Sequence, residues 1–226
     1  MGNMTFKTST NRAPRKTTPG REGPEKSYRF ILKTIADIGL VGFPNAGKSS
    51  LTNCITHAHP KTAPYPFTTL HVNVGIIEYP TFERVIMAYI PGLIEGAHEN
   101  KGLGHRFLRH IERCRLLLFI IDMAGSEGRD PVKDYKHLVK ELGQYSEVLT
   151  DKPRIIAANK MDYPEAEDNL KAFKKKVKGF EIIPISCVSH AGLEELKTEI
   201  LTRVKADKAR QAAEGINPAL AFDDAE

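Results

Sequence analysis

Eight residues in the first quarter of the chain have the composition and spacing of a phosphate-binding loop. Gly42, Gly47, Lys48 and Ser49 follow the pattern G-x-x-x-x-G-K-[ST], with residues 43–46 in the variable positions. Glycines let backbone N–H groups turn toward phosphate oxygens, and the N-terminus of a following helix adds partial positive charge. We therefore expect Lys48 to bind the terminal phosphates and the Ser49 hydroxyl to bind Mg²⁺.

A second motif, N-K-x-D, points to the base of a nucleotide. Asp162 can accept hydrogen bonds from N1–H and the exocyclic amine of guanine, two donors that adenine does not present in that arrangement. Lys160 can lay its aliphatic stem over the base, and Asn159 can tie the loop together. Backbone N–H groups at Ser186 and Cys187 could reach the guanine O6. There are two alternatives to a guanine-binding motif: the run could be an ordinary polar turn, or the protein could be an enzyme that uses ATP.

These motifs need a scaffold that brings loops together, and the apolar pattern supplies one. Short β-rich runs are expected as strands at residues 36–41, 72–78, 84–90, 116–121, 154–158 and 181–185. Helical patterns alternate with them at residues 48–56, 104–113, 134–145, 165–176 and 191–204. Strands that are apolar at every position are typical of a parallel sheet covered on both faces. We predict an α/β fold, a P-loop NTPase G domain with a mostly parallel six-stranded sheet and helices on both faces.

The net charge of +5 sits at the N-terminus rather than on the predicted domain. The first 30 residues carry seven basic and two acidic groups, so the other 196 residues are neutral. With its prolines and lack of apolar periodicity, this segment is expected to be an extended or disordered arm. The charge therefore gives no reason to infer binding to DNA.

Composition excludes several other classes of protein. Apolar residues make up 41% and charged residues 27%, which is typical of a soluble globular chain and not of collagen-like or disordered ones. The apolar run at residues 116–121 is too short to span a bilayer. Cys54, Cys114 and Cys187 are odd in number and widely spaced, which favours a reducing cytoplasm over a disulfide scaffold.

Further runs carry a resemblance to one family. Residues 65–70 (YPFTTL), 90–98 (IPGLIEGAH) and 102–113 (GLGHRFLRHIER), together with the phosphate loop and N-K-x-D, resemble the Obg (CgtA) family of GTPases. The resemblance covers residues 34–204. It implies a GTPase that associates with the large ribosomal subunit and acts in its assembly and in stress signalling. It also implies a cytoplasmic protein without membrane or DNA partners, and we expect a monomer.

The resemblance extends the set of expected site residues. It implies that Thr69, with Thr68 as the alternative, closes over the γ-phosphate and Mg²⁺, and that Gly92 binds the γ-phosphate through its N–H. Catalysis is then assigned to Lys48, Thr69 and Gly92, and Mg²⁺ to Ser49 and Thr69. The residues expected to bind GTP or GDP are Gly42, Pro44, Asn45, Ala46, Gly47, Lys48, Ser49, Ser50, Phe67, Thr68, Thr69, Gly92, Asn159, Lys160, Asp162, Ser186 and Cys187.

The chain departs from the family pattern at the expected metal strand. Tyr89 stands where the family has the Asp of Asp-x-Pro-Gly, and a neutral phenol is a poor substitute for a carboxylate near Mg²⁺. Two interpretations remain open: a slow GTPase, or a GTP- and GDP-binding scaffold that docks on the ribosome and barely hydrolyses GTP. Asp122, which ends an apolar run, is an alternative acid for the metal, although the family alignment puts it on the next strand.

Two other positions bear on hydrolysis. Leu93 follows Gly92 where Ras-like enzymes carry the Gln that orients the attacking water, so hydrolysis is expected to be slow. Asn45 resembles the phosphate-loop Asn of GTPases that use K⁺ in place of an arginine finger, which makes K⁺ a candidate cofactor.

The chain is expected to have three parts. Residues 1–33 resemble the end of the Gly-rich N-terminal domain of the family and form the basic arm, residues 34–204 form the G domain, and residues 205–226 form a helix end and a flexible tail. The rest of that N-terminal domain is not in the sequence, so we expect a fragment of a longer protein.

Overall fold

The structure is a computed structural model that describes residues 3–15, 18, 20–23, 25–26, 36–56, 61–63, 72–89 and 114–213. Residues 3, 61–63, 72, 73, 89 and 145 are described by their backbone alone. The chain divides into two compact units, residues 1–31 and 32–226. In the first unit, a 3₁₀ helix, η1 (Asn3–Phe6), is followed by a turn in which Asn11 donates its backbone N–H to the Thr8 hydroxyl at 3.1 Å.

The second unit is built on a sheet of seven strands. They are β1 (Ala36–Val41), β2 (Lys61–Ala63), β3 (Val72–Glu78), β4 (Arg84–Tyr89), β5 (Cys114–Asp122), β6 (Arg154–Asn159) and β7 (Glu181–Pro184). Their order is β2-β3-β4-β1-β5-β6-β7, and every pair is parallel except β2–β3 and β3–β4. The predicted α/β G-domain fold is confirmed. The six predicted strands are present, and the additional β2 has only three residues, too few to show a pattern in the sequence.

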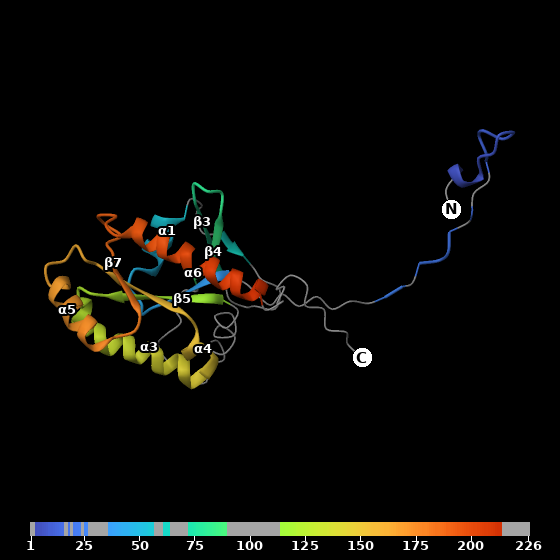
Figure 1. Ribbon diagram of the computed structural model, residues 1–226. Coiled ribbons are helices and arrows are strands. Elements are labelled where there is room, and N and C mark those ends of the chain that lie inside the picture. The colour runs from blue at the N-terminus through green and yellow to red at the C-terminus, as the bar shows by residue number, and fades with distance from the viewer. Residues whose placement is uncertain are drawn as a thin grey trace. The chain divides into compact units, whose positions relative to one another are not determined.

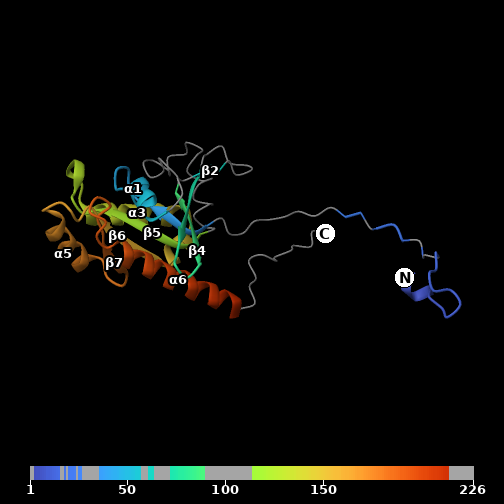
Figure 2. The same cartoon turned by 90° about the horizontal axis from the view of Figure 1, so that it is seen from above.

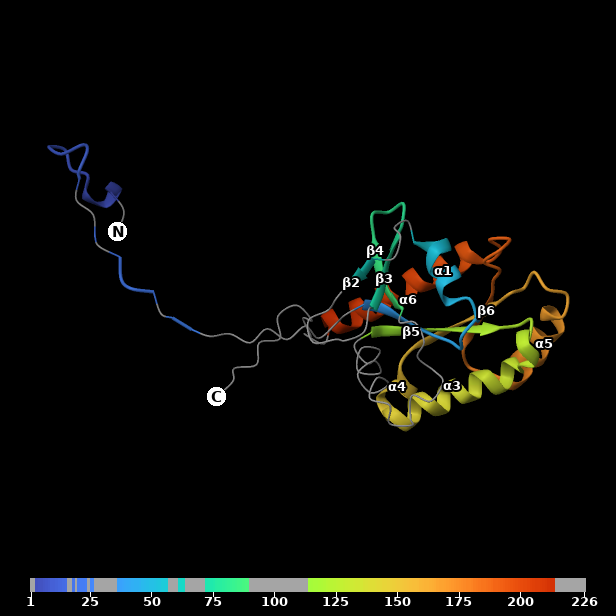
Figure 3. The same ribbon diagram turned by 180° about the vertical axis from the view of Figure 1, so that it is seen from behind.

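Helices cover both faces of this sheet (Figure 1). They are α1 (Lys48–Ile55), α3 (Pro131–Tyr145), α4 (Glu147–Asp151), α5 (Ala166–Lys176) and α6 (Leu193–Ala213), with a short 3₁₀ helix, η2 (Ser126–Gly128), before α3. One core lies between the sheet and α1 with α6, and the other between the sheet and α3, α4 and α5. The same two layers are visible from behind in Figure 3, and Figure 2 shows α6 alongside the sheet from above.

Helix boundaries differ from the predicted ones where capping and ion pairs decide them. Helix α3 begins three residues early because Asp130 caps it: its Oδ1 accepts N–H bonds from Val132 at 2.8 Å and Lys133 at 3.4 Å, and Pro131 suits the first turn. Helix α6 continues nine residues past the predicted end at Val204. The expected helix at residues 104–113 lies outside the described residues.

The order of the strands determines where a ligand can bind. The chain leaves β1 toward the β4 side of the sheet and returns to β5 on the other side, so β1 and β5 flank the point where the strand order reverses. Ligands of open α/β sheets bind at the carboxyl ends of the strands at that point. None of the helices in the described part of the chain combines the length and apolar composition needed to cross a bilayer.

Candidate functional site

The phosphate loop joins the end of β1 to α1 and is closely packed at its two glycines. A Cβ on Gly42 would lie 2.7 Å from the carbonyl oxygen of Ile120 in β5. Gly47 has φ of 102°, and a Cβ there would lie 2.2 Å from Nδ2 of Asn159. Both positions therefore require glycine. At Gly42 the backbone of β5 leaves no room for a side chain, and at Gly47 both the positive φ and the side chain of Asn159 exclude one.

Lys48, the first residue of α1, points its side chain into the loop. Its Nζ donates to the backbone carbonyls of Gly42 at 2.7 Å and Phe43 at 2.6 Å. The residue is only 8% exposed, and this burial lowers the pKa of the ammonium to about 8. The chain thus holds a cation inside the curve of the loop, where an anionic group would favour its charged form.

The two sequence motifs meet through Asn159, the last residue of β6. Its side-chain Nδ2 donates to the carbonyl oxygen of Ala46 at 2.8 Å, and its backbone carbonyl accepts from the N–H of Met123 at 2.9 Å. The residue is 2% exposed. The phosphate loop and N-K-x-D therefore form one continuous surface at the carboxyl ends of β1 and β6.

Asp162 lies at the exposed rim of this surface and is held by Ser186. The Ser186 hydroxyl donates to Asp162 Oδ1 at 2.6 Å and accepts the N–H groups of Val188 at 3.2 Å and Ser189 at 3.1 Å. The N–H of Ser186 itself is donated to the carbonyl of Ala191 at 3.0 Å. The sequence suggested a role for that N–H, but in the structure Ser186 acts on Asp162 through its hydroxyl.

Lys160 makes contacts that the sequence did not indicate. Its backbone is left-handed, with φ of 66°, and its Nζ donates to Asp122 Oδ2 at 2.8 Å and to the Ser126 hydroxyl at 2.9 Å. Asp122 Oδ1 accepts the N–H of Ala124 at 2.9 Å. Both oxygens of Asp122 are thus engaged by the protein, and β5 lies on the far side of β1 from β4. This placement argues against the alternative in which Asp122 replaces the metal-strand acid.

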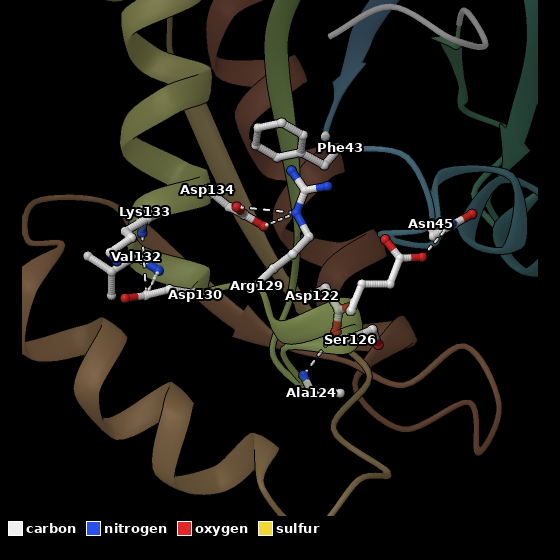
Figure 4. A network of polar contacts seen from close by, with 12 residues as sticks. Phe43, Asn45, Asp122, Ala124, Ser126, Arg129, Asp130, Val132, Lys133 and Asp134 are labelled. Carbon is white, nitrogen blue, oxygen red and sulfur yellow. Dashed lines mark hydrogen bonds and ion pairs between the residues drawn. The ribbon is translucent and has the colours of Figure 1, made fainter. Parts of the chain in front are cut away.

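The segment between β5 and α3 also supports the phosphate loop from outside (Figure 4). The guanidinium of Arg129 lies 3.9 Å from the centre of the Phe43 ring, and its Nε is 3.1 Å from Asp134 Oδ2. Burial raises the pKa of Asp134, and the charge of Arg129 opposes that rise. The Asn45 side chain donates to Glu127 Oε1 at 3.0 Å. In the sequence, only the apolar run that ends in Asp122 could have pointed to this segment.

Of the remaining predicted site residues, some lie in the described part of the chain and others do not. Ser49 and Ser50 are exposed on the first turn of α1, and the Cys54 thiol on that helix donates to the carbonyl of Cys187 at 3.5 Å. Burial raises the pKa of the Cys187 thiol to about 12. Tyr89 ends β4, with its Cα opposite that of Asn73 in β3. Four predicted site residues lie outside the described part of the chain: Phe67, Thr68, Thr69 and Gly92.

Metal-binding clusters give no further candidate. Within the residues that the structure describes, no group of three or more His, Cys, Asp or Glu side chains could hold a metal ion.

Comparison with known proteins identifies relatives of this chain. The family described as 50S ribosome-binding GTPase matches residues 37–160. GTPase Obg of Opitutus terrae is 57% identical over 93% of this chain and 62% of that protein, and GTPase Obg of Bacillus licheniformis is 51% identical over 90% and 48%. The chain thus spans about half to three-fifths of the length of these relatives.

Solved structures resemble the fold. Nucleolar GTP-binding protein 1 of Plasmodium falciparum has a TM-score of 0.60 at 23% identity and covers 82% of this chain and 94% of its own. Era of Aquifex aeolicus, solved with GDP and AlF₄⁻, has a TM-score of 0.53 at 27% identity and covers 74% and 56%. The first shows the fold alone, and the second shows it in a protein crystallised with a guanine nucleotide.

Proposed function

Because the chain belongs to the 50S ribosome-binding GTPase family and resembles the G domain of Obg-type members over nearly its whole length, we propose that it binds GTP and GDP and hydrolyses GTP slowly. The observation that carries this proposal is the hydrogen bond of 2.8 Å from Asn159 to Ala46. It places a motif suited to guanine directly against a loop suited to phosphates.

Each part of the nucleotide has a set of residues suited to it. Lys48 and the N–H groups of residues 45–50 bind the phosphates, because a buried cation and a helix N-terminus both favour negative charge there. Asp162, held by Ser186, accepts the hydrogen bonds of guanine, and the stem of Lys160 covers the base. By family resemblance, Thr69 and Gly92 contact the γ-phosphate.

The Ser49 hydroxyl fits Mg²⁺, since it is exposed beside Lys48 at the start of α1. Bound Mg²⁺ would neutralise charge on the phosphates. Ser49 and Thr69 are the residues we assign to hold it. Tyr89 gives this chain no carboxylate at the place where the family has one, so a second candidate function is a GTP- and GDP-binding scaffold that hydrolyses poorly.

Base specificity is tested by changing the acceptor into a donor. In Asp162→Asn the new amide can donate to the carbonyl at C2 of xanthine, whereas it meets two donors of guanine. We expect GDP affinity to fall by 10²-fold or more and xanthosine diphosphate to become the better ligand. Asp168→Asn, at an exposed position of α5, is the control and should leave both affinities unchanged. If wild-type protein binds ADP as tightly as GDP, the proposal is wrong.

Hydrolysis is tested by single-turnover cleavage of GTP with Mg²⁺ by the wild-type chain and by Tyr89→Asp. A large gain in the variant favours the scaffold, and equal rates favour the GTPase. The same assay in KCl and in NaCl tests whether Asn45 helps to hold K⁺, since equal rates in the two salts would remove that role.

The cellular setting is proposed from the relatives. We propose a monomer that acts in the cytoplasm on the large ribosomal subunit, in its assembly and in stress response, with residues 34–204 as the G domain, residues 1–33 as part of an N-terminal Obg domain and residues 205–226 as its C-terminal end. Co-sedimentation with purified large subunits in GDP and in a non-hydrolysable GTP analogue tests it. Equal absence from the pellet in both would contradict it.

A further inference from the structure

Lys160 is held at its backbone and at its ammonium group. Its backbone holds φ of 66°, a conformation that only a few per cent of non-glycine residues adopt. Its ammonium reaches back to the end of β5, where Asp122 Oδ2 lies at 2.8 Å, and to the start of η2, where the Ser126 hydroxyl lies at 2.9 Å. The four-carbon stem between these two ends therefore has one path to follow.

The acceptor of this ion pair is itself rigid. The side chain of Asp122 is 8% exposed and that of Lys160 is 22% exposed. Asp122 ends the buried strand β5, its Cα is paired with that of Asn159 in β6, and its Oδ1 accepts the N–H of Ala124 at 2.9 Å. A half-buried pair with a fixed carboxylate holds its geometry better than an exposed pair, which water screens and side-chain entropy opposes.

We propose that Asp122 is a positioning residue for guanine recognition, which holds the Lys160 ammonium so that the stem of Lys160 keeps one place against the base. The inference rests on the proposed function, because it assumes that this stem covers guanine. Asp122 itself touches no part of the nucleotide. Ser126 acts as the second acceptor, and an unheld lysine would lose part of its contact with the base to the freedom of its four rotatable bonds.

A simpler structural role for Asp122 predicts different results. Its Oδ1 also caps the turn at Ala124, and loss of that bond would disturb the segment whatever Lys160 does. Asp122→Asn separates the two roles, because the amide oxygen can still accept from Ala124 while the negative charge is removed. Lys160→Met supplies the other half of the comparison, since it keeps an apolar stem and has no ammonium to hold.

The experiment is a double-mutant cycle on GDP affinity, measured by fluorescence with a labelled GDP. We expect Asp122→Asn to weaken binding about 5- to 30-fold in the wild-type background and less than 2-fold in the Lys160→Met background, because coupled residues do not add. Asp130→Asn, a change to the cap of α3 in the same segment, is the matched control. Because Asn caps a helix about as well as Asp, this change should leave both thermal stability and GDP affinity nearly unchanged.

Each other result has a distinct meaning. Equal losses in the two backgrounds would overturn the inference and leave only the turn-capping role. Failure of the wild-type chain to bind GDP would instead remove the proposed function. Should Asp122→Asn not fold, Ser126→Ala takes its place in the cycle, with an expected loss of about 2- to 5-fold that vanishes in Lys160→Met. An additive loss for Ser126→Ala would overturn the inference as well.

Discussion

The side-chain amide of Asn159 and the carbonyl of Ala46 are 113 residues apart in sequence and 2.8 Å apart in space. This hydrogen bond is buried, and it is the contact by which the end of β6 fixes the shape of the phosphate loop. The carbonyl of Ala46 is oriented by Asn159, so the N–H of Gly47, on the other side of the same peptide unit, can face a ligand. The guanine motif thus also supports phosphate binding.

Replacement of Asn159 by Ala is expected to weaken both stability and GDP binding. The change leaves the buried carbonyl of Ala46 without its donor, which costs about 1–3 kcal/mol. Asn169→Ala is a matched control, because Asn169 donates a similar bond of 2.8 Å to the carbonyl of Met123 away from the phosphate loop. Urea unfolding and GDP titration should show similar stability losses for the two variants and an affinity loss of tenfold or more for Asn159→Ala alone.

Gly47→Ala is expected to abolish nucleotide binding for two separable reasons. A methyl group there would lie 2.2 Å from Asn159 Nδ2, and φ of 102° is unfavourable for alanine. Gly128 also has a positive φ, 72°, but open space around it. Gly128→Ala should therefore cost only about 1 kcal/mol from its conformation. Thermal unfolding and GDP titration of the pair would contradict this account if the two variants behaved alike.

The sequence revealed the strands and the two motifs because both depend on local pattern. The strands 36–41 and 72–78 were predicted with the bounds that β1 and β3 have in the structure. A strand buried on both faces, such as β1, is recognisable in the sequence because nearly all its residues are apolar. The motif glycines were recognisable for the same reason, since their spacing alone defines the turn.

What the sequence did not reveal depends on contacts between distant residues. Arg129 and Glu127 occur in a segment with no motif, and Asp122 was considered only as an acid for the metal; their contacts arise because β5 lies beside β1 and β6. The sequence predicted a helix end after residue 204 but not where it lies, because Asp207 and Lys208 of α6 pair with Arg115 of β5 and Asp37 of β1. Pairings of this kind have no signature in a single sequence.

The lowered pKa of Lys48 predicts two opposite effects of pH. In the free protein the ammonium loses its proton near pH 8, while the unfolded chain keeps it to about 10.5. Lys48 therefore contributes stability that increases as pH rises from 8 toward 10.5. Nucleotide binding needs the charged form, so GDP affinity should fall as pH rises from 7 to 8.5.

Calorimetry can measure the proton that this linkage requires. If the phosphates keep Lys48 charged in the complex, GDP binding at pH 8 takes up roughly half a proton. The apparent binding enthalpy should then differ between buffers of low and high ionisation enthalpy at pH 8 and differ less at pH 7. Identical enthalpies in the two buffers at pH 8 would show that Lys48 is already fully charged without a ligand.

Loss of Arg129 is expected to destabilise the protein most at neutral pH. Arg129→Met removes the partner of Asp134, whose side chain is 14% exposed, and should cost about 1–3 kcal/mol at pH 7. Without Arg129 the pKa of Asp134 rises further, so the deficit should shrink as pH falls from 7 to 4 and the carboxyl becomes neutral. Arg203→Met, at a less buried pair with Glu199, is the control for urea unfolding at both pH values.

Asp207→Asn tests whether the end of α6 belongs to the folded domain. The side chains of Arg115, Asp37 and Asp207 are 9%, 9% and 12% exposed, and Arg115 Nη1 lies 3.2 Å from Asp207 Oδ2. This cluster holds α6 to the beginnings of β1 and β5. Loss of one charge leaves Arg115 with Asp37 as its remaining carboxylate partner among the described residues, at a cost of about 1–3 kcal/mol.

A measurement of GDP affinity distinguishes the role of this cluster from that of the nucleotide site. The cluster lies at the amino ends of the strands, whereas the phosphate loop lies at their carboxyl ends. Asp207→Asn should therefore lower the urea midpoint and leave GDP affinity within twofold of wild type. Asp168→Asn, which removes an exposed carboxylate beside Lys171, should change neither quantity. An unchanged midpoint for Asp207→Asn would mean that the domain is complete near residue 204, as the sequence alone led us to expect.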